Sequence, residues 1–523
     1  MGKKQANTTG IDTGTIDDKQ FKGLIAKRSQ MLLSLASCLS RCESPEKILS
    51  RPFLGELLSQ SIQVEELLDA YDARNNCTWC RFRALTAAIK LFTDVSYGLL
   101  HIQHALPAYR LLAIESDFVR ATGRALEFTA DVIHRTAERI VHEAQTLELP
   151  VPAEAVLRQG YEERLPAGRL PHNCQALKEG TVSETVKLLA TAFLNLAAES
   201  RQVQAACIAE PVEYAGYVAE SASEESLRGL ELRFHNLQSL YDTYVSGTEV
   251  EKADTDLPVL RGHISVVFHL LSTAVAFAHY YERHVKKPFC NVQAQKEPLV
   301  NAELLLAMLV NYSVSFSGHY IVCARRLCHQ MLRKYVELDR IEVNVPPYRG
   351  FHVRPSTLIS KLVLHYGSEV RMELASEQYD ASVPLELFRA NEKINAEKRR
   401  SLANEIVHLG LVPKQAGAKD VAAIIHEVVM ALSEGGRLVL YEQSLQLPKE
   451  MASTGAILLE QVNDQMAQLL ATGKIDISTD LKVSFVGDKR VLQDIKLLAD
   501  SGYGEDSFGN NIALPKELTY LRR

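Results

Sequence analysis

The feature that most constrains the fold is a change in hydrophobic periodicity near residue 340. Before it, apolar side chains recur at steps of three and four, for example over residues 21–39 and 118–147, which predicts amphipathic helices. Residues 341–345 instead alternate apolar and polar side chains, which is typical of a strand. The sequence therefore predicts a large all-α N-terminal region followed by a domain that contains a sheet.

Composition limits the number of domains and the kind of partner. The chain has 523 residues, of which 46% are hydrophobic, so it can bury several cores, and about three or four domains are expected. Its formal net charge of -6 provides no excess positive field for a phosphate backbone, which argues against nucleic acid as the main partner.

Prolines and glycines suggest where the helical region divides. Residues 149–180 contain four prolines and several glycines, so we expect a linker there. It would separate a helical domain at 19–148 from a second helical domain at 181–340. Residues 1–18 are polar and lack the apolar core of a signal peptide, so a disordered tail and a cytoplasmic location are expected.

Two uncharged stretches, 262–281 and 304–324, are long enough to cross a bilayer. The first contains three histidines, and the second contains an asparagine, three serines and a histidine. Such side chains are costly in hydrocarbon. We therefore expect these stretches to be buried helices of a soluble domain, without membrane insertion.

After residue 340 the predicted elements alternate between strands and helices. A helix is expected to begin at Pro355, whose fixed φ suits a first helical position. Its apolar stripe (Leu358, Ile359, Leu362 and Val363) has the spacing of one face packed on a sheet. The other predicted elements are strands at 369–374, 379–383 and 437–441, a short helix at 385–390 opened by Pro384, and a helix at 450–470. This order is typical of an α+β open-faced sandwich, with helices on one side of a sheet.

One short motif lies between the first strand and the first helix of this domain. It consists of Gly350, Phe351, His352, Arg354, Pro355 and Ser356. Together with the order of the elements, it resembles HPr, the histidine phosphocarrier of the bacterial phosphotransferase system, over residues 341–473 with a helical insertion at 391–434. Residues 474–523 would then form a C-terminal extension.

The resemblance implies that His352 accepts a phosphoryl group from a donor protein, enzyme I, and that the acceptor is a sugar-transport subunit. In this chain we expect His352 either to pass the phosphoryl group on or to signal through the helical region. It implies no cofactor, and it makes Leu387 and Phe388 candidates for the docking surface. The chain departs from the family pattern in three ways. Val353 replaces a small residue, Pro384 stands where many members have a regulatory serine, and residues 391–434 are inserted.

The chemistry of these residues is consistent with a phosphate site. A phosphoryl group on an imidazole is an anion, and the first turn of a helix offers unpaired N–H groups and the positive end of the helix dipole. The Arg354 guanidinium matches phosphate oxygens in a bidentate way. A neutral imidazole is also a competent nucleophile near neutral pH.

Two other hypotheses remain open for the function. In the first, the HPr-like domain is a scaffold that docks partners without being phosphorylated. In the second, the helical region has its own ligand or activity, which the HPr-like domain regulates. The sequence does not decide between them.

Four cysteines are candidate metal ligands. Cys77 and Cys80 form a CxxC, and Cys38 and Cys42 lie one helical turn apart. Four thiolates in this arrangement would suit zinc, and a CxxC alone would suit redox chemistry. Ordinary reduced, buried thiols are the third interpretation, and we predict no metal site.

Overall fold

A computed structural model of the chain describes residues 15–43, 50–152, 181–206, 210–286, 298–413, 421–441, 457–478 and 480–522. These residues are mostly helical and contain small antiparallel sheets, as the sequence predicts. They divide into two units. The helical unit comprises Met1–Thr185 and Leu196–Leu327, and the sheet unit comprises Val186–Asn195 and Cys328–Arg523.

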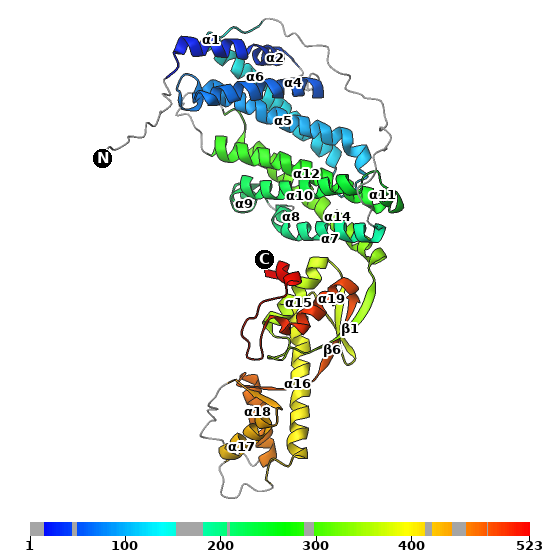
Figure 1. Ribbon diagram of the computed structural model, residues 1–523. Helices are drawn as coiled ribbons and strands as arrows, with labels where there is room; N and C mark the ends of the chain where they lie inside the picture. The colour runs from blue at the N-terminus through cyan, green and yellow to red at the C-terminus, as the bar shows by residue number, and fades with distance from the viewer. Residues whose placement is uncertain are drawn as a thin grey trace, which may run out of the picture. The chain divides into compact units, whose positions relative to one another are not determined.

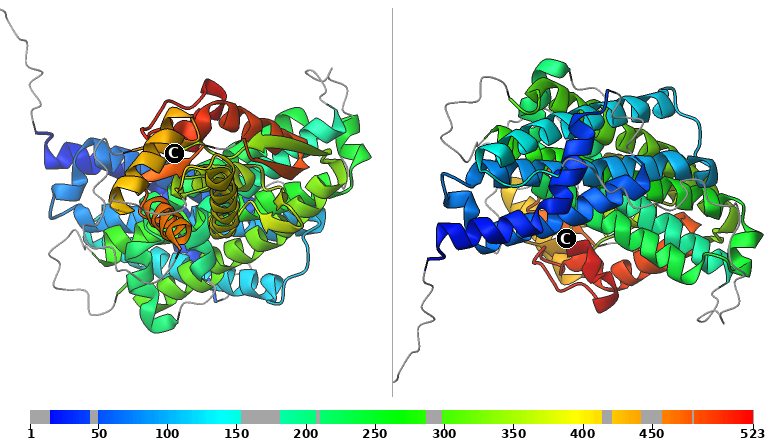
Figure 2. Two further views of the ribbon diagram at one scale, coloured as in Figure 1. Left: turned by 90° about the horizontal axis from the view of Figure 1, so that it is seen from below. Right: turned by 90° about the horizontal axis from the view of Figure 1, so that it is seen from above.

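The helices of the first unit run side by side in the views of Figures 1 and 2. Polar residues begin several of them: Asp117 caps α6, Ser50 caps α4, and Thr181 and Glu184 form a capping box at α7. The helices are α1 (Asp18–Arg28), α2 (Gln30–Ser40), α4 (Arg51–Ala70), α5 (Cys80–Tyr109), α6 (Phe118–Thr146), α8 (Arg201–Ala205), α9 (Tyr214–Glu220), α10 (Glu224–Tyr244), α11 (Glu249–Ala253), α12 (Asp256–Tyr280) and α13 (Ala302–Ala307), while α7 (Val182–Glu199) and α14 (Ser315–Tyr335) contribute to both units.

The two helical domains expected from the sequence form one unit instead. Phe92 of α5 contacts Tyr280 and Phe277 of α12, with ring centroids 4.9 and 6.4 Å apart, and all three rings are buried. A shared aromatic core joins helices from both sides of the predicted linker, because each half has an apolar face that needs a partner. Residues 153–180 of that linker lie outside the described part of the chain.

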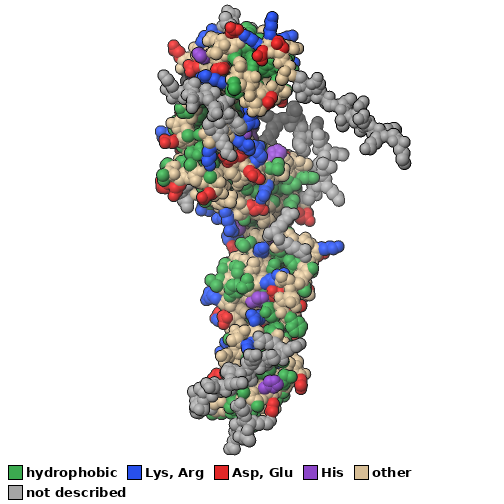
Figure 3. Space-filling model, turned by 90° about the vertical axis from the view of Figure 1, so that its left-hand side faces the viewer, with side chains coloured by type: hydrophobic (Ala, Val, Ile, Leu, Met, Phe, Trp, Pro, Cys, Tyr) green, Lys and Arg blue, Asp and Glu red, His purple; other side chains and the backbone are tan. Residues whose placement is uncertain are grey.

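Two helical stretches have the length and apolar character of a membrane span. They are Asp256–Val285 and Ala302–Tyr335, with mean hydropathy values of 1.4 and 1.3, and 67% of each most apolar window is buried within the structure. On the face drawn in Figure 3, acidic and basic side chains are interspersed over the helical unit.

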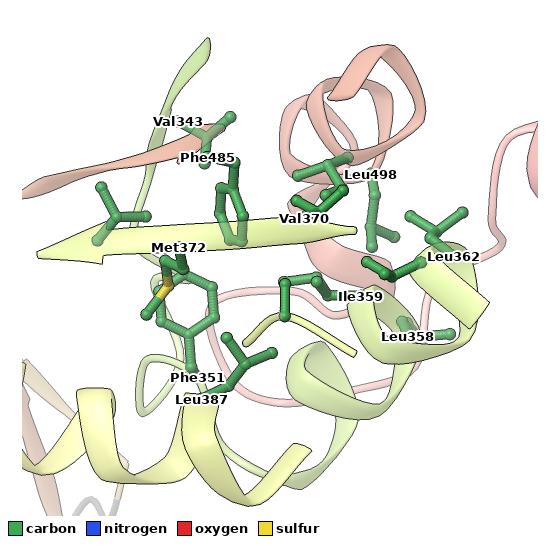
Figure 4. Packing of buried hydrophobic residues seen from close by; sticks show 14 of the residues in the cluster. Val343, Phe351, Leu358, Ile359, Leu362, Val370, Met372, Leu387, Phe485 and Leu498 are labelled. Atoms are coloured by element: carbon green, nitrogen blue, oxygen red, sulfur yellow. The ribbon is translucent and has the colours of Figure 1, made fainter. Parts of the chain in front are cut away.

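The sheet unit contains a four-stranded antiparallel sheet in the order β1-β6-β2-β3. Its strands are β1 (Leu338–Asn344), β6 (Lys482–Asp488), β2 (Val370–Leu374) and β3 (Glu377–Asp380). The core side chains of β1, β2 and β6 share a single buried cluster with those of α15 (Val353–Tyr366), the beginning of α16 (Pro384–His408) and α19 (Lys489–Asp500). Phe351, Met372 and Leu387 point toward one another in this core (Figure 4).

The register of the sheet places apolar side chains on one face. Val343 pairs with Val483, and Met372 pairs with Phe485. Since Val483 and Phe485 are two residues apart, they point to the same side. The predicted apolar stripe of the first helix is confirmed, because all four of its side chains are buried in this core.

The last strand and last helix of this sheet differ from those expected. The stretch 437–441 contributes only β4 (Leu438–Leu440), which pairs with β5 (Ile475–Ile477) in a separate two-stranded sheet. The last strand of the main sheet along the chain is β6, and α19 follows it. Both lie in the expected C-terminal extension 474–523. The expected domain boundary at residue 473 would therefore separate β6 and α19 from the sheet and the core to which they belong.

The inserted segment is larger than expected and has its own core. We call it the inserted subdomain: the end of α16, α17 (Val421–Glu434), β4, α18 (Leu458–Ala471) and β5. α16 is one 25-residue helix, where a short helix at 385–390 was expected. Leu387 lies in the main core and Ile406 in the inserted core, so this helix connects the two.

Leu387 is fully buried, which excludes it from the docking surface for which it was a candidate. Leu387→Ala is expected to cost about 3 kcal/mol, because it leaves a cavity in the main core. In native-state hydrogen exchange, β2 and β6 amides should then lose roughly a hundredfold in protection. Leu385→Ala is the matched control, because Leu385 is 64% exposed on the same helix. Equal effects of the two substitutions would contradict the placement of Leu387 in the main core.

Candidate functional site

The loop before α15 holds His352 at the N-cap of that helix. Arg349 and Gly350 precede it with φ values of 51° and 62°, in the left-handed region. Asn391 of α16 fixes this turn: its Oδ1 accepts from the Phe351 N–H at 2.9 Å, and its Nδ2 donates to the Arg349 carbonyl at 3.0 Å. A Cβ at Gly350 would lie 2.1 Å from Asn391 Oδ1. Glycine is therefore needed at this position, both for its conformation and for the close approach of Asn391.

Both ring nitrogens of His352 face oxygen acceptors. Nδ1 lies 3.1 Å from the Gly350 carbonyl oxygen, and Nε2 lies 3.0 Å from Glu505 Oε2. The Tyr348 ring meets the imidazole edge to face, with centroids 5.3 Å apart. The His352 side chain keeps 23% of its surface exposed, so the imidazole lies at the edge of the unit rather than in its core.

Arg354 faces the same carboxylate from the first turn of α15. Its Nε lies 3.8 Å from Glu505 Oε1 and is buried without a hydrogen-bond partner among the described residues. The Glu505 side chain is only 9% exposed. An imidazole and a guanidinium at a helix N-terminus therefore face one buried anionic group, which is the arrangement of an anion site.

Two other motif residues, Pro355 and Ser356, have roles that differ from those expected. α15 begins at Val353, so Pro355 is its third residue and not its first. Ser356 is fully buried, and its hydroxyl donates to the Phe351 carbonyl at 2.9 Å. It therefore fixes the loop and does not offer a donor to a ligand. The Val353 side chain is 67% exposed.

The inserted subdomain contacts the loop before α15 at Arg349. The Arg349 N–H donates to Asp476 Oδ2 at 2.8 Å, and the Arg349 guanidinium donates to the Gly473 carbonyl at 2.9 Å. Asp476 also forms an ion pair with Lys398 of α16 at 3.0 Å, and both side chains are at most 2% exposed. A buried charge is stable only when it is paired and hydrogen bonded. The position of the turn before His352 therefore depends on this subdomain.

A tyrosine contact adds to this connection. The Tyr441 ring, next to β4, lies 5.1 Å from the Tyr348 ring, which itself contacts His352. Burial raises the pKa of Tyr441 well above its ordinary value. Tyr441 is therefore a neutral packing group beside the site.

Sequence patterns did not reveal Glu505, Asn391 or Asp476 as parts of the site. Glu505 follows Gly504 in a glycine-rich loop, which is typical of a surface turn. Asn391 and Asp476 lie 42 and 127 residues from Arg349. A local pattern contains no information about such pairings, and no signal in one sequence would have identified them.

The remaining candidates do not join this site. Phe388 is partly buried on α16. Cys38, Cys42, Cys77 and Cys80 are free thiols, of which Cys77 is exposed and Cys80 is buried. Within the described ranges, no three side chains of the metal-binding types come together. The four cysteines therefore do not converge on a shared site.

Comparison of the chain with protein-family models, with curated proteins and with solved structures finds no match.

Proposed function

We propose that the sheet unit is an HPr-like phosphocarrier domain in which His352 accepts a phosphoryl group from a donor protein. The order of its elements supports this: β1, α15, β2, β3, α16, β6 and α19 follow the order strand, helix, strand, strand, helix, strand, helix. The helices and the sheet share one core. The inserted subdomain interrupts this order without disturbing the main sheet.

The observation that carries the proposal is the anionic group already present at the site. The carboxylate of Glu505 lies against His352 and Arg354 at the start of α15. A site with this electrostatic character favours a phosphoryl group on the same imidazole.

The transfer needs no metal or nucleotide. A lone pair of the His352 imidazole attacks the phosphorus of a phosphohistidine on the donor, and a new N–P bond forms. The N–P bond of the donor breaks, and its electron pair returns to the donor imidazole. Each ring keeps the proton on its other nitrogen, so protons and electrons balance.

The test is phosphoryl transfer to the full-length chain from purified enzyme I and phosphoenolpyruvate. An acid-labile label is expected, and it should map to the tryptic peptide 350–361, in which His352 is the only histidine. Trypsin does not cleave inside this peptide, because Arg354 precedes a proline. Phosphoramidate, a small donor that releases ammonia, serves as a second arm that needs no protein donor. Absence of label from both donors would reject the proposal and favour a scaffold that docks partners through the same fold.

A further inference from the structure

The C-terminal loop 501–512 places Glu505 against the imidazole through a set of specific contacts. Tyr503 donates to the Asn344 carbonyl at 2.7 Å, which fixes the loop to the end of β1. The Glu505 N–H donates to the Gly502 carbonyl at 3.1 Å, and the Ile512 N–H donates to the Gly504 carbonyl at 3.0 Å. The carboxylate therefore reaches His352 from a structured loop and not from a free end.

This loop adopts unusual backbone conformations. Gly502, Tyr503, Gly504 and Gly509 have φ values of 75°, 57°, 75° and 82°. Tyr503 is not a glycine, so its left-handed conformation is strained. A Cβ at Gly509 would lie 2.6 Å from the Tyr348 ring, which itself contacts His352. The loop therefore combines a strained residue, Tyr503, with close packing of Gly509 against the site.

While these contacts persist, an oxygen atom lies against each ring nitrogen of His352. A neutral imidazole has one N–H and one acceptor nitrogen. Its two nitrogens face a carbonyl oxygen and a carboxylate oxygen, and both of these are acceptors. Only a doubly protonated ring satisfies both contacts, and that ring cannot attack phosphorus. Attack therefore requires one of the two contacts to break.

The carboxylate and a phosphoryl group also compete for the same positive groups. Within the described part of the chain, the ion partners of Glu505 are His352 and Arg354. A phosphoryl dianion on the ring would replace an attractive partner of a nearly buried carboxylate with a repulsive one. A nearly buried carboxylate beside a like charge is costly, so the carboxylate would move into solvent.

We infer that loop 501–512 is an autoinhibitory latch, in which Glu505 occupies the phosphoryl position and keeps His352 unreactive until the loop opens. This inference rests on the proposed function, because it regulates the same site. Since coupling between two equilibria is reciprocal, phosphorylation of His352 shifts the loop toward its open form by the same factor by which loop closure disfavours the phosphorylated state.

The test measures His352 reactivity without any phosphoryl donor. Diethyl pyrocarbonate acylates an imidazole nitrogen that has a free lone pair, and mass spectrometry of peptide 350–361 resolves His352 from the other histidines. Glu505→Gln removes the charge at similar shape, and acylation is expected to accelerate about tenfold, the effect of losing one charge-assisted contact. Glu517→Gln is the control, because Glu517 is an exposed residue of the same C-terminal segment.

A second arm uses phosphoramidate on the same three proteins, which are the unmodified chain, Glu505→Gln and Glu517→Gln. Faster acylation and faster phosphorylation of Glu505→Gln, with Glu517→Gln unchanged, would support the latch. Faster acylation without phosphorylation in any of the proteins would retain the latch and reject the phosphocarrier function. Equal acylation of all three proteins would overturn the latch, whatever the outcome with phosphoramidate.

Discussion

His352→Ala is expected to abolish the acid-labile label on peptide 350–361 completely. The substitution removes the only imidazole of that peptide, and its remaining hydroxyl groups would form phosphate esters that are stable in acid. The Ser356 hydroxyl is buried and donates to the Phe351 carbonyl. A serine phosphate would in any case survive acid. The expected result is therefore a total loss and not a partial one.

The control for this variant is His408→Ala, because His408 is exposed at the C-terminal end of α16. This protein should be labelled at the rate of the unmodified chain from both enzyme I and phosphoramidate. Persistent acid-labile label in His352→Ala, or its loss in His408→Ala, would move the phosphoryl acceptor to another histidine. The folded state of each variant is checked by hydrogen exchange in β6.

Lys398→Met is expected to cost about 4 kcal/mol, because it leaves Asp476 as a buried charge without its ion partner. In native-state hydrogen exchange, the amides of β5 should lose roughly a thousandfold in protection. Since Asp476 also holds the Arg349 N–H, the turn before His352 should lose protection together with the subdomain.

A double variant separates the unpaired charge from a loss of packing. Asp476→Asn in the Lys398→Met background removes the negative charge, and its amide oxygen still accepts from Arg349. Most of the lost protection is expected to return. The surface control is Lys393→Met, because Lys393 pairs with Glu377 at the exposed side of the same helix, and such pairs contribute little. No recovery in the double variant would mean that Lys398 acts through packing alone.

Local patterns predicted the beginning of the sheet domain well. β1, α15 and β2 lie within a few residues of their predicted positions, and the helix stripe faces the core as expected. Each of these elements shows its periodicity within its own few residues. His352 and Arg354 were found for the same reason, since the strand, the turn and the helix that position them are contiguous in the chain.

The end of the domain could not be predicted in this way. The stretches around Leu438 and Phe485 both look like strands, and only pairing decides which one enters the main sheet. All seven residues of β6 pair with β1 and four of them also pair with β2, whereas β4 has three residues and one partner. The longer strand fills the centre of the sheet, where it makes more backbone hydrogen bonds and packs Val483 and Phe485 into the core.

The sequence by itself determined that this chain is mostly helical, that a sheet begins near residue 340, and that a histidine and an arginine lie at the start of one helix. These properties depend on side-chain periodicity and on backbone preferences that act over a few residues. Only the tertiary structure decided that Glu505 faces His352, that Asp476 holds the turn before it, and that Leu387 is buried. Each of these depends on contacts between segments far apart in the chain, whose formation is decided by burial and charge pairing in the folded core.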